Sequence, residues 1–196
     1  MIASAKNITT TNKNVIVSFF KEMNATKTSN VKNVLENYCD KNIIVNITSP
    51  FEEMKGIESF FNEFWMPLFS SFLDTEFQPY ILIGDDYEER NYVSCTGNFV
   101  GTFKEDWLQI PASNQPTSLR YTALFRIENS KIIKAWYFFD MLYIIRQAGF
   151  NLFPNRGKEL VPPAPMTNDG ILNHDTNSVE GQDTLNLINN MLDGLS

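Results

Sequence analysis

The chain has 196 residues, of which 43% are hydrophobic and 13% are aromatic; the aromatic residues include 16 phenylalanines. This length predicts one domain with a substantial core, and the phenylalanines favour either a Phe-rich core or a lined cavity. The formal net charge of −7 and the absence of a Lys/Arg cluster argue against a nucleic-acid partner. One histidine and two distant cysteines predict neither a metal site nor a disulfide framework.

The N-terminal residues and the two cysteines indicate the cellular compartment in which the protein is expected. Residues 1–13 are polar, so they are predicted to be a flexible N-terminus without a secretory signal. No apolar run approaches the ~20 residues that span a bilayer, and we expect no membrane as a partner. Cys39 and Cys95 are expected to be structural thiols in a reducing compartment, which predicts a cytoplasmic location.

Helices are predicted in the N-terminal part of the chain, over residues 14–26, 29–38 and 57–72. Ser29 is a candidate N-cap for the second of them. The third is apolar on more than one face, which predicts burial on several sides, and Pro67 is expected to kink or split it. Trp65 lies on this helix and is expected either to pack in the core or to line a cavity.

Strands are predicted over residues 42–48, 76–83, 92–103, 118–127 and 132–139. Short polar connections between the later strands predict an antiparallel meander. Gly97 and Gly101 lie inside one strand and predict bends or bulges, hence a strongly curved sheet. A short helix over 141–148, ended by Gly149, completes an α+β domain over residues 14–150.

Residues 151–196 are predicted to be a Pro-rich extension with a candidate C-terminal helix. Proline is frequent up to Met166, and the segment that follows is polar and linker-like. Leu185, Ile188 and Leu192 share one side of a short helix over 184–195. Docking on the domain, docking on a second subunit and disorder all remain open for this helix.

Several segments follow one another in a characteristic order: Gly56 ahead of the aromatic helix, Gly97–Phe103, Lys131–Trp136 leading to Asp140, and Arg146–Gly149. In this order and spacing they resemble the SnoaL-like polyketide cyclases, within the nuclear-transport-factor-2-like superfamily, over residues 14–150. The resemblance implies a cone-shaped domain in which a curved antiparallel sheet packs against N-terminal helices and encloses a pocket. It also implies a homodimer through the outer sheet face, and neither a metal nor an organic cofactor.

Asp140 is the catalytic candidate. The resemblance implies that this carboxyl is the general acid/base of an intramolecular aldol closure. The residues alone leave two roles open: a desolvated acid/base with a raised pKa, or an N-cap that accepts backbone N–H groups of the following helix. Strand parity predicts that Asp140 shares a face with Ile132, Trp136 and Phe138.

The substrate-binding candidates are Tyr121, Trp136, Phe138, Asn98, Trp107, Trp65 and Arg120. Tyr121 can polarise a carbonyl or pack in the core, and Arg120 can bind an anionic group or form an ion pair. Trp107 lies in an irregular loop over 104–117 that can cover the cone mouth. The cyclases commonly supply a histidine from the strand matching residues 120–127, whereas the only histidine here is His174.

The sequence therefore supports two hypotheses. The first is a cofactor-independent enzyme with cyclase-, isomerase- or hydratase-like acid/base chemistry on a small, apolar carbonyl compound. The second is a non-catalytic module that binds a hydrophobic molecule or dimerises; the missing strand histidine favours it. An enclosed pocket that contains the Asp140 carboxyl would support the enzyme. A solvent-facing carboxylate, or a cone filled with aromatic rings, would remove that support.

Overall fold

A computed structural model describes residues 2–26, 30–150, 152, 170–171 and 178–194 of the chain. The helices are α1 (Ile2–Ala25), α2 (Val31–Tyr38), α3 (Gly56–Phe60), the π-helical turn η2 (Phe61–Trp65), α4 (Met66–Ser71), α5 (Met141–Gln147) and α6 (Ser178–Asp193). The strands are β1 (Cys39–Ile47), β2 (Met54–Lys55), β3 (Phe72–Tyr87), β4 (Arg90–Phe103), β5 (Pro116–Glu128), β6 (Lys131–Phe139) and β7 (Gly170–Ile171).

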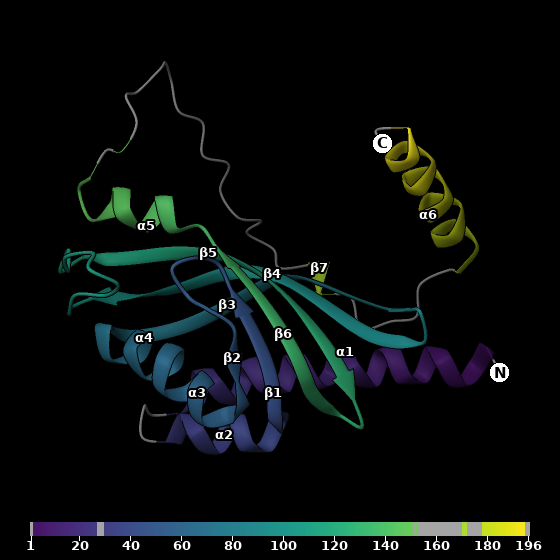
Figure 1. Cartoon of the computed structure of the whole chain (residues 1–196), viewed down its shortest axis with the longest axis horizontal. Helices are drawn as coiled ribbons and strands as arrows, with labels where there is room; N and C mark the ends of the chain where they lie inside the picture. The colour runs from purple at the N-terminus through teal and green to yellow at the C-terminus, as the bar shows by residue number, and fades with distance from the viewer. Residues whose placement is uncertain (1, 27–29, 151, 153–169, 172–177, 195–196) are drawn as a thin grey trace.

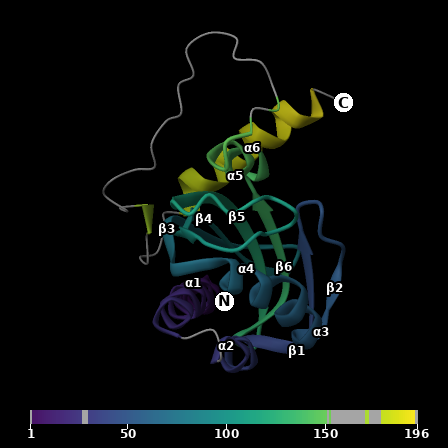
Figure 2. The same ribbon diagram turned by 90° about the vertical axis from the view of Figure 1, so that its left-hand side faces the viewer.

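One seven-stranded sheet, in the order β2-β1-β6-β5-β4-β3-β7, organises the domain. The predicted antiparallel meander is confirmed, because β3, β4, β5 and β6 pair antiparallel in sequence. The sheet is nevertheless mixed, since β1 pairs parallel with β6 and β7 pairs parallel with β3. Figures 1 and 2 show α1 to α4 together on one side of the curved sheet, with α5 and α6 on the other. The α+β fold class is confirmed.

Glycines mark the curvature, as predicted. The pairing of β3 with β4 shifts register twice, next to the partners of Gly97 and close to Gly101. An added Cβ on Gly97 would lie 2.6 Å from the carbonyl oxygen of Gln78, so β3 presses its backbone directly onto β4 there. Only glycine tolerates so close an approach.

The first helix is longer than predicted. It begins at Ile2 and not at Asn14, so residues 2–13 are helical where a flexible terminus was expected. This half was not predicted because it lacks apolar periodicity. Polar residues of this half lie beside β3: side-chain carbons of Thr9 and Lys13 are 3.1–3.3 Å from the position that a Cβ on Gly84 would take. In α2 the N-cap is Asn30, and Ser29 lies outside the described residues.

The third predicted helix is divided into α3, η2 and α4. Pro67 lies in the first turn of α4, immediately after the π-helical turn. Proline lacks an N–H and its ring clashes with the preceding turn, so an irregular turn at this place has a physical cause. The predicted split is therefore present, although Phe72 already belongs to β3.

Aromatic side chains fill the space between the helices and the sheet. The largest fully buried residues are Trp65, Trp107, Tyr121, Tyr137, Phe19, Phe60, Phe64, Phe72, Phe77, Phe99, Phe103 and Phe125. Their rings are in direct contact, as in the stacked pair Phe72–Phe103 with centroids 4.6 Å apart. Such pairs add about 0.5–1.5 kcal/mol each beyond their burial. No helix in the described parts of the chain is long and apolar enough to cross a membrane.

Candidate functional site

Tyr121 lies in the aromatic interior of the cone. Its parity on β5 is as predicted, since Ala123 and Phe125 point the same way and all three are buried. The Tyr121 hydroxyl lies 3.9 Å from the thiol sulfur of Cys95 on the neighbouring strand. Burial raises the pKa of Tyr121 well above its ordinary value, so the phenol is a neutral hydrogen-bond donor at physiological pH.

The indole nitrogens of Trp65 and Trp107 have no hydrogen-bond partner among the described residues, although both atoms are buried. Trp65 is enclosed by rings from several elements; its ring lies 5.8 Å from Phe69 and 6.5 Å from Tyr137, centroid to centroid. A buried donor without a partner is uncommon in native proteins and calls for an explanation.

Trp107 belongs to the loop between β4 and β5 and closes one end of the interior. Its ring lies 6.2 Å from Phe51 and 5.9 Å from Phe72, and only 2% of its surface is exposed. Backbone hydrogen bonds in both directions join Trp107 to Ile110 and make a compact turn. The turn carries Leu108 and Gln109 at φ of 52° and 63°, a conformation that residues other than glycine rarely adopt.

Strand β6 presents different residues to the interior from those predicted. Ala135, Tyr137 and Phe139 are buried, whereas Phe138 is 59% exposed and Trp136 is half-buried on the outer face. The predicted shared face holds for Trp136 and Phe138 but not for Ile132, which is buried, because the pairing of β5 with β6 shifts register between Arg126 and Ile127. One extra residue in a strand turns the following side chains to the opposite face.

Tyr137 is therefore a residue that the sequence argument missed. Its hydroxyl-bearing ring stacks on Phe139, and burial raises its pKa well above the ordinary value. On the outer face Trp136 packs instead under the ammonium of Lys134, 4.8 Å from the ring centre.

The remaining strand candidates also lie outside the cone. Asn98 and Arg120 are directly opposite each other across β4 and β5, on the partly exposed face. This is the face shared with Arg126 and the exposed Thr122, and it is turned away from Tyr121. The structure thus brings Trp65, Tyr121 and Trp107 together in the interior and separates them from Asn98, Arg120, Trp136 and Phe138.

Asp140 is exposed and caps α5. Its carboxylate accepts a hydrogen bond of 3.1 Å from the backbone N–H of Tyr143. Helix α5 is itself held in place by Gln147, whose side-chain amide exchanges two hydrogen bonds with the backbone of Ser118, at 2.9 and 2.6 Å. This is the capping role that the sequence left open.

The chemistry of the interior is that of neutral donors. The phenols of Tyr121 and Tyr137, the indole N–H groups and the Cys95 thiol can donate to a carbonyl oxygen in a water-poor setting. Both conditions stated against the enzyme hypothesis are met in this conformation: the Asp140 carboxylate faces solvent, and aromatic rings fill the cone. The described residues contain no group of acidic, histidine or cysteine side chains able to hold a metal ion.

Comparison with known proteins places this fold. The family model for SnoaL-like polyketide cyclases matches residues 14–148. A protein of Jannaschia sp. CCS1 assigned to these cyclases is 22% identical, with a TM-score of 0.59 over 70% of this chain and 94% of its own. TsrD from Streptomyces laurentii is 19% identical, with a TM-score of 0.56 over 69% of this chain and 95% of its own.

AclR from Streptomyces galilaeus, assigned as a hydroxylase, is 13% identical, with a TM-score of 0.59 over 75% of this chain and 89% of its own. No curated protein matches the chain. A curved sheet packed against N-terminal helices, shared with these structures, is the nuclear-transport-factor-2-like cone fold. The chain belongs to the SnoaL-like polyketide cyclase family.

Proposed function

We propose that this domain binds a small, mostly apolar carbonyl compound in its aromatic interior. The observation that supports the proposal is the pair of buried indole N–H groups, on Trp65 and Trp107, that have no partner among the described residues. A buried donor left without an acceptor costs about 1–3 kcal/mol. A carbonyl oxygen would satisfy such a donor while the rest of the compound packs against the rings.

We propose further that the loop carrying Trp107 opens to admit the compound. Leu108, Gln109 and Asn114 in this loop have positive φ angles of 52°, 63° and 57°. Residues held in this region cost on the order of 1 kcal/mol each and persist where their surroundings fix them. Burial of Trp107 supplies that constraint, so its withdrawal would relax the loop.

The test compares 1-tetralone with tetralin, in which a methylene replaces the carbonyl group, by isothermal titration calorimetry. The ketone is expected to bind about fivefold more tightly, since one added hydrogen bond is worth about 1 kcal/mol. Trp107→Phe and Trp65→Phe each remove one indole donor and keep an aromatic ring. At least one of them should abolish the preference. Equal affinity for both probes, or a preference that survives in both variants, would overturn the proposal.

Acid/base catalysis by Asp140 is the second candidate function. It is supported by membership of the cyclase family and by the position of Asp140 at the end of β6. In the conformation described, the carboxylate is outside the rings, so catalysis would need the carboxylate to approach a compound bound beneath the opened loop. Cyclase-, isomerase- and hydratase-like proton transfers all fit this arrangement.

Asp140→Asn separates catalysis from capping, because asparagine is as good an N-cap as aspartate. We expect this variant to keep its thermal stability and ligand affinity and to lose turnover of any compound that the wild type converts. Asp140→Ala is the matched control: loss of the cap should lower its stability by about 1 kcal/mol. Turnover that persists in Asp140→Asn would rule out the catalytic role.

We also propose that the outer sheet face forms a homodimer in the cytoplasm. Apolar side chains on this face are exposed, with Phe138 at 59%, Ile83 at 62% and Leu73 at 51%. Exposed apolar side chains on one face of a sheet can pack against the same face of a second copy. Cys39 and Cys95 are both free and buried, which agrees with a reducing compartment.

Sedimentation equilibrium tests the dimer. Phe138→Ser is expected to weaken self-association by at least about tenfold, because a central aromatic contributes strongly to such interfaces. Leu187→Ser removes an apolar residue of α6 that is more exposed than Phe138, at 70%, and should leave association unchanged. A monomeric wild type, or a dimer indifferent to Phe138→Ser, contradicts the proposal.

A further inference from the structure

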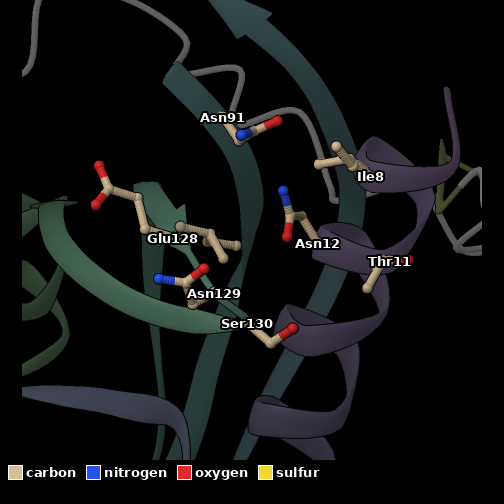
Figure 3. A pocket seen from close by; sticks show the side chains of 8 residues that line it. Ile8, Thr11, Asn12, Asn91, Glu128, Asn129 and Ser130 are labelled. Atoms are coloured by element: carbon tan, nitrogen blue, oxygen red, sulfur yellow. The ribbon is translucent and has the colours of Figure 1, made fainter. Parts of the chain in front are cut away.

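A cavity lies between α1 and the ends of β4 and β5 (Figure 3). In Figure 1 these strand ends lie at the end of the sheet remote from α5. Its volume is about 620 Å³, within the range of small-molecule sites. It is lined by Ile8, Thr11, Asn12, Asn91, Ile127, Glu128, Asn129 and Ser130. None of these residues belongs to the aromatic interior discussed above except Ile127, which borders both.

Asn12 is the central polar group of this cavity. It lies on α1 with only 6% of its surface exposed, and Figure 3 shows its amide pointing away from the helix into the cavity. Its side chain takes part in no hydrogen bond among the described residues. The amide atoms of Asn12 are not among the fully buried polar atoms that lack a partner, so they are accessible from the cavity, where a ligand can form hydrogen bonds with them.

The turn between β5 and β6 forms the opposite wall. Asn129 and Ser130 connect the paired residues Glu128 and Lys131, and their φ angles are 49° and 59°. Two successive positive φ angles define the tight hairpin turn in which Asn-Gly is preferred. Serine at the second position is less favourable than glycine, yet it presents a hydroxyl toward α1 (Figure 3).

The lining selects for an uncharged ligand with many hydroxyl groups. Each carboxamide of Asn12, Asn91 and Asn129 both donates and accepts hydrogen bonds, which suits a hydroxyl that does the same. The side chains of Ile8 and Ile127 offer apolar surface for a carbon skeleton.

Charged ligands fit poorly. The described lining residues include no lysine or arginine, so they offer an anion no countercharge. The one carboxylate among them, on Glu128, is already paired with Arg126 and does not make a cation site. We propose that this cavity binds a neutral polyhydroxylated compound, a sugar or a polyol, independently of the cone interior.

The experiment is an NMR titration of the full chain with glucose, N-acetylglucosamine and myo-inositol, followed through the side-chain amide signals of Asn12, Asn91 and Asn129. At least one probe should shift these signals with a dissociation constant on the order of millimolar. Glucose 6-phosphate should bind more weakly than glucose because no cationic side chain is among the lining residues that the structure describes. Absence of shifts with every neutral probe, or tighter binding of the phosphate, would overturn the proposal.

Variants make the assignment specific. Asn12→Leu should weaken binding by at least about tenfold, since it removes the central hydrogen-bonding group of the cavity. Ser130→Gly should fold more stably, because it creates the preferred Asn-Gly turn, and should bind more weakly. Asn33→Leu changes an exposed asparagine of α2 and should leave the dissociation constants of the neutral probes unchanged. Unchanged affinity in both Asn12→Leu and Ser130→Gly would refute the site.

Discussion

Gly97 is the residue on which the position of Tyr121 depends. An added Cβ would lie 2.7 Å from the Tyr121 hydroxyl oxygen and 2.8 Å from the Cα of Pro79, in addition to the close contact with Gln78. The site therefore has no room for a side chain between β3 and the phenol. The hydroxyl of Tyr121 is thereby held beside Cys95, within the ring network of the interior.

Gly97→Ala is expected to destabilise the domain by about 2–3 kcal/mol, because backbone atoms of β3 must move to accommodate the methyl group. Urea unfolding measures the loss. Gly84→Ala is the matched control on β3: its nearest atoms belong to the flexible Lys13 and Thr9 side chains at 3.1–3.3 Å, so less than about 1 kcal/mol is expected. Equal effects of the two substitutions would show that close backbone approach is not what matters at Gly97.

Among single residues, sequence parity placed Tyr121 correctly and Trp136 and Phe138 incorrectly. Strand β5 is regular over Tyr121, whereas the register shift in β6 leaves no mark in a run of hydrophobic residues. Where both faces of a strand are apolar, the sequence lacks the alternation that reveals a bulge. The role of Asp140 was equally undetermined, because a carboxylate at a strand-to-helix junction can serve either in capping or in catalysis.

At the scale of elements, β7 shows how the C-terminal extension contacts the domain. Gly170 pairs with Ile81 and Ile171 pairs with Leu82, in parallel, along the free edge of β3. A Cβ on Gly170 would lie 2.5 Å from the carbonyl oxygen of Tyr80. Only glycine allows the extension to approach β3 this closely.

Gly170→Ala is therefore expected to detach β7 and leave the rest of the domain folded. Hydrogen exchange should become faster at the outer edge of β3 around Ile81 and Leu82, with the melting temperature almost unchanged. Gly181→Ala, in α6, has no atom within 4 Å and should not affect β3; it should instead favour the helix by about 1 kcal/mol. Unaltered exchange in Gly170→Ala would mean that β7 contributes no protection.

Long elements with a clear period could be predicted from the sequence, and very short ones could not. The meander strands β3 to β6 were recognised from β-branched and aromatic runs between polar turns. Strands β2 and β7 have two residues each, which is too short for any periodicity. They are defined only by their pairing with β1 and β3. The cavity at Asn12 was missed for a related reason, since the polar half of α1 carries no apolar stripe.

At the scale of the whole molecule, burial of weak acids links stability to alkaline pH. Burial raises the pKa of Cys39 and of Cys95 from 9.0 to about 12, and it raises those of Tyr121 and Tyr137 in the same direction. In the unfolded chain the thiols ionise near pH 9, while the folded chain keeps their protons. The folded state then binds more protons, so its stability is complete below pH 9 and falls as the pH rises toward 12.

Urea unfolding measured across this range should show a steadily falling free energy of unfolding. Cys95→Ser removes one of the thiols, so its decline with pH should be shallower than that of the wild type, whatever its stability at neutral pH. If the free energy of unfolding declined equally with pH in the wild type and in Cys95→Ser, the Cys95 thiol would have the same pKa in the folded and the unfolded chain.

The two-residue strands at the margins of the sheet have a consequence for self-assembly. The order β2-β1-β6-β5-β4-β3-β7 places one of them at each end. A short edge offers an approaching chain little backbone to pair with, which protects against amyloid-like stacking. Loss of β7 would expose β3, which spans Phe72–Tyr87 and carries the exposed Ile81 and Ile83. A chain shortened before Gly170 is therefore expected to aggregate through this strand, although its core would be intact.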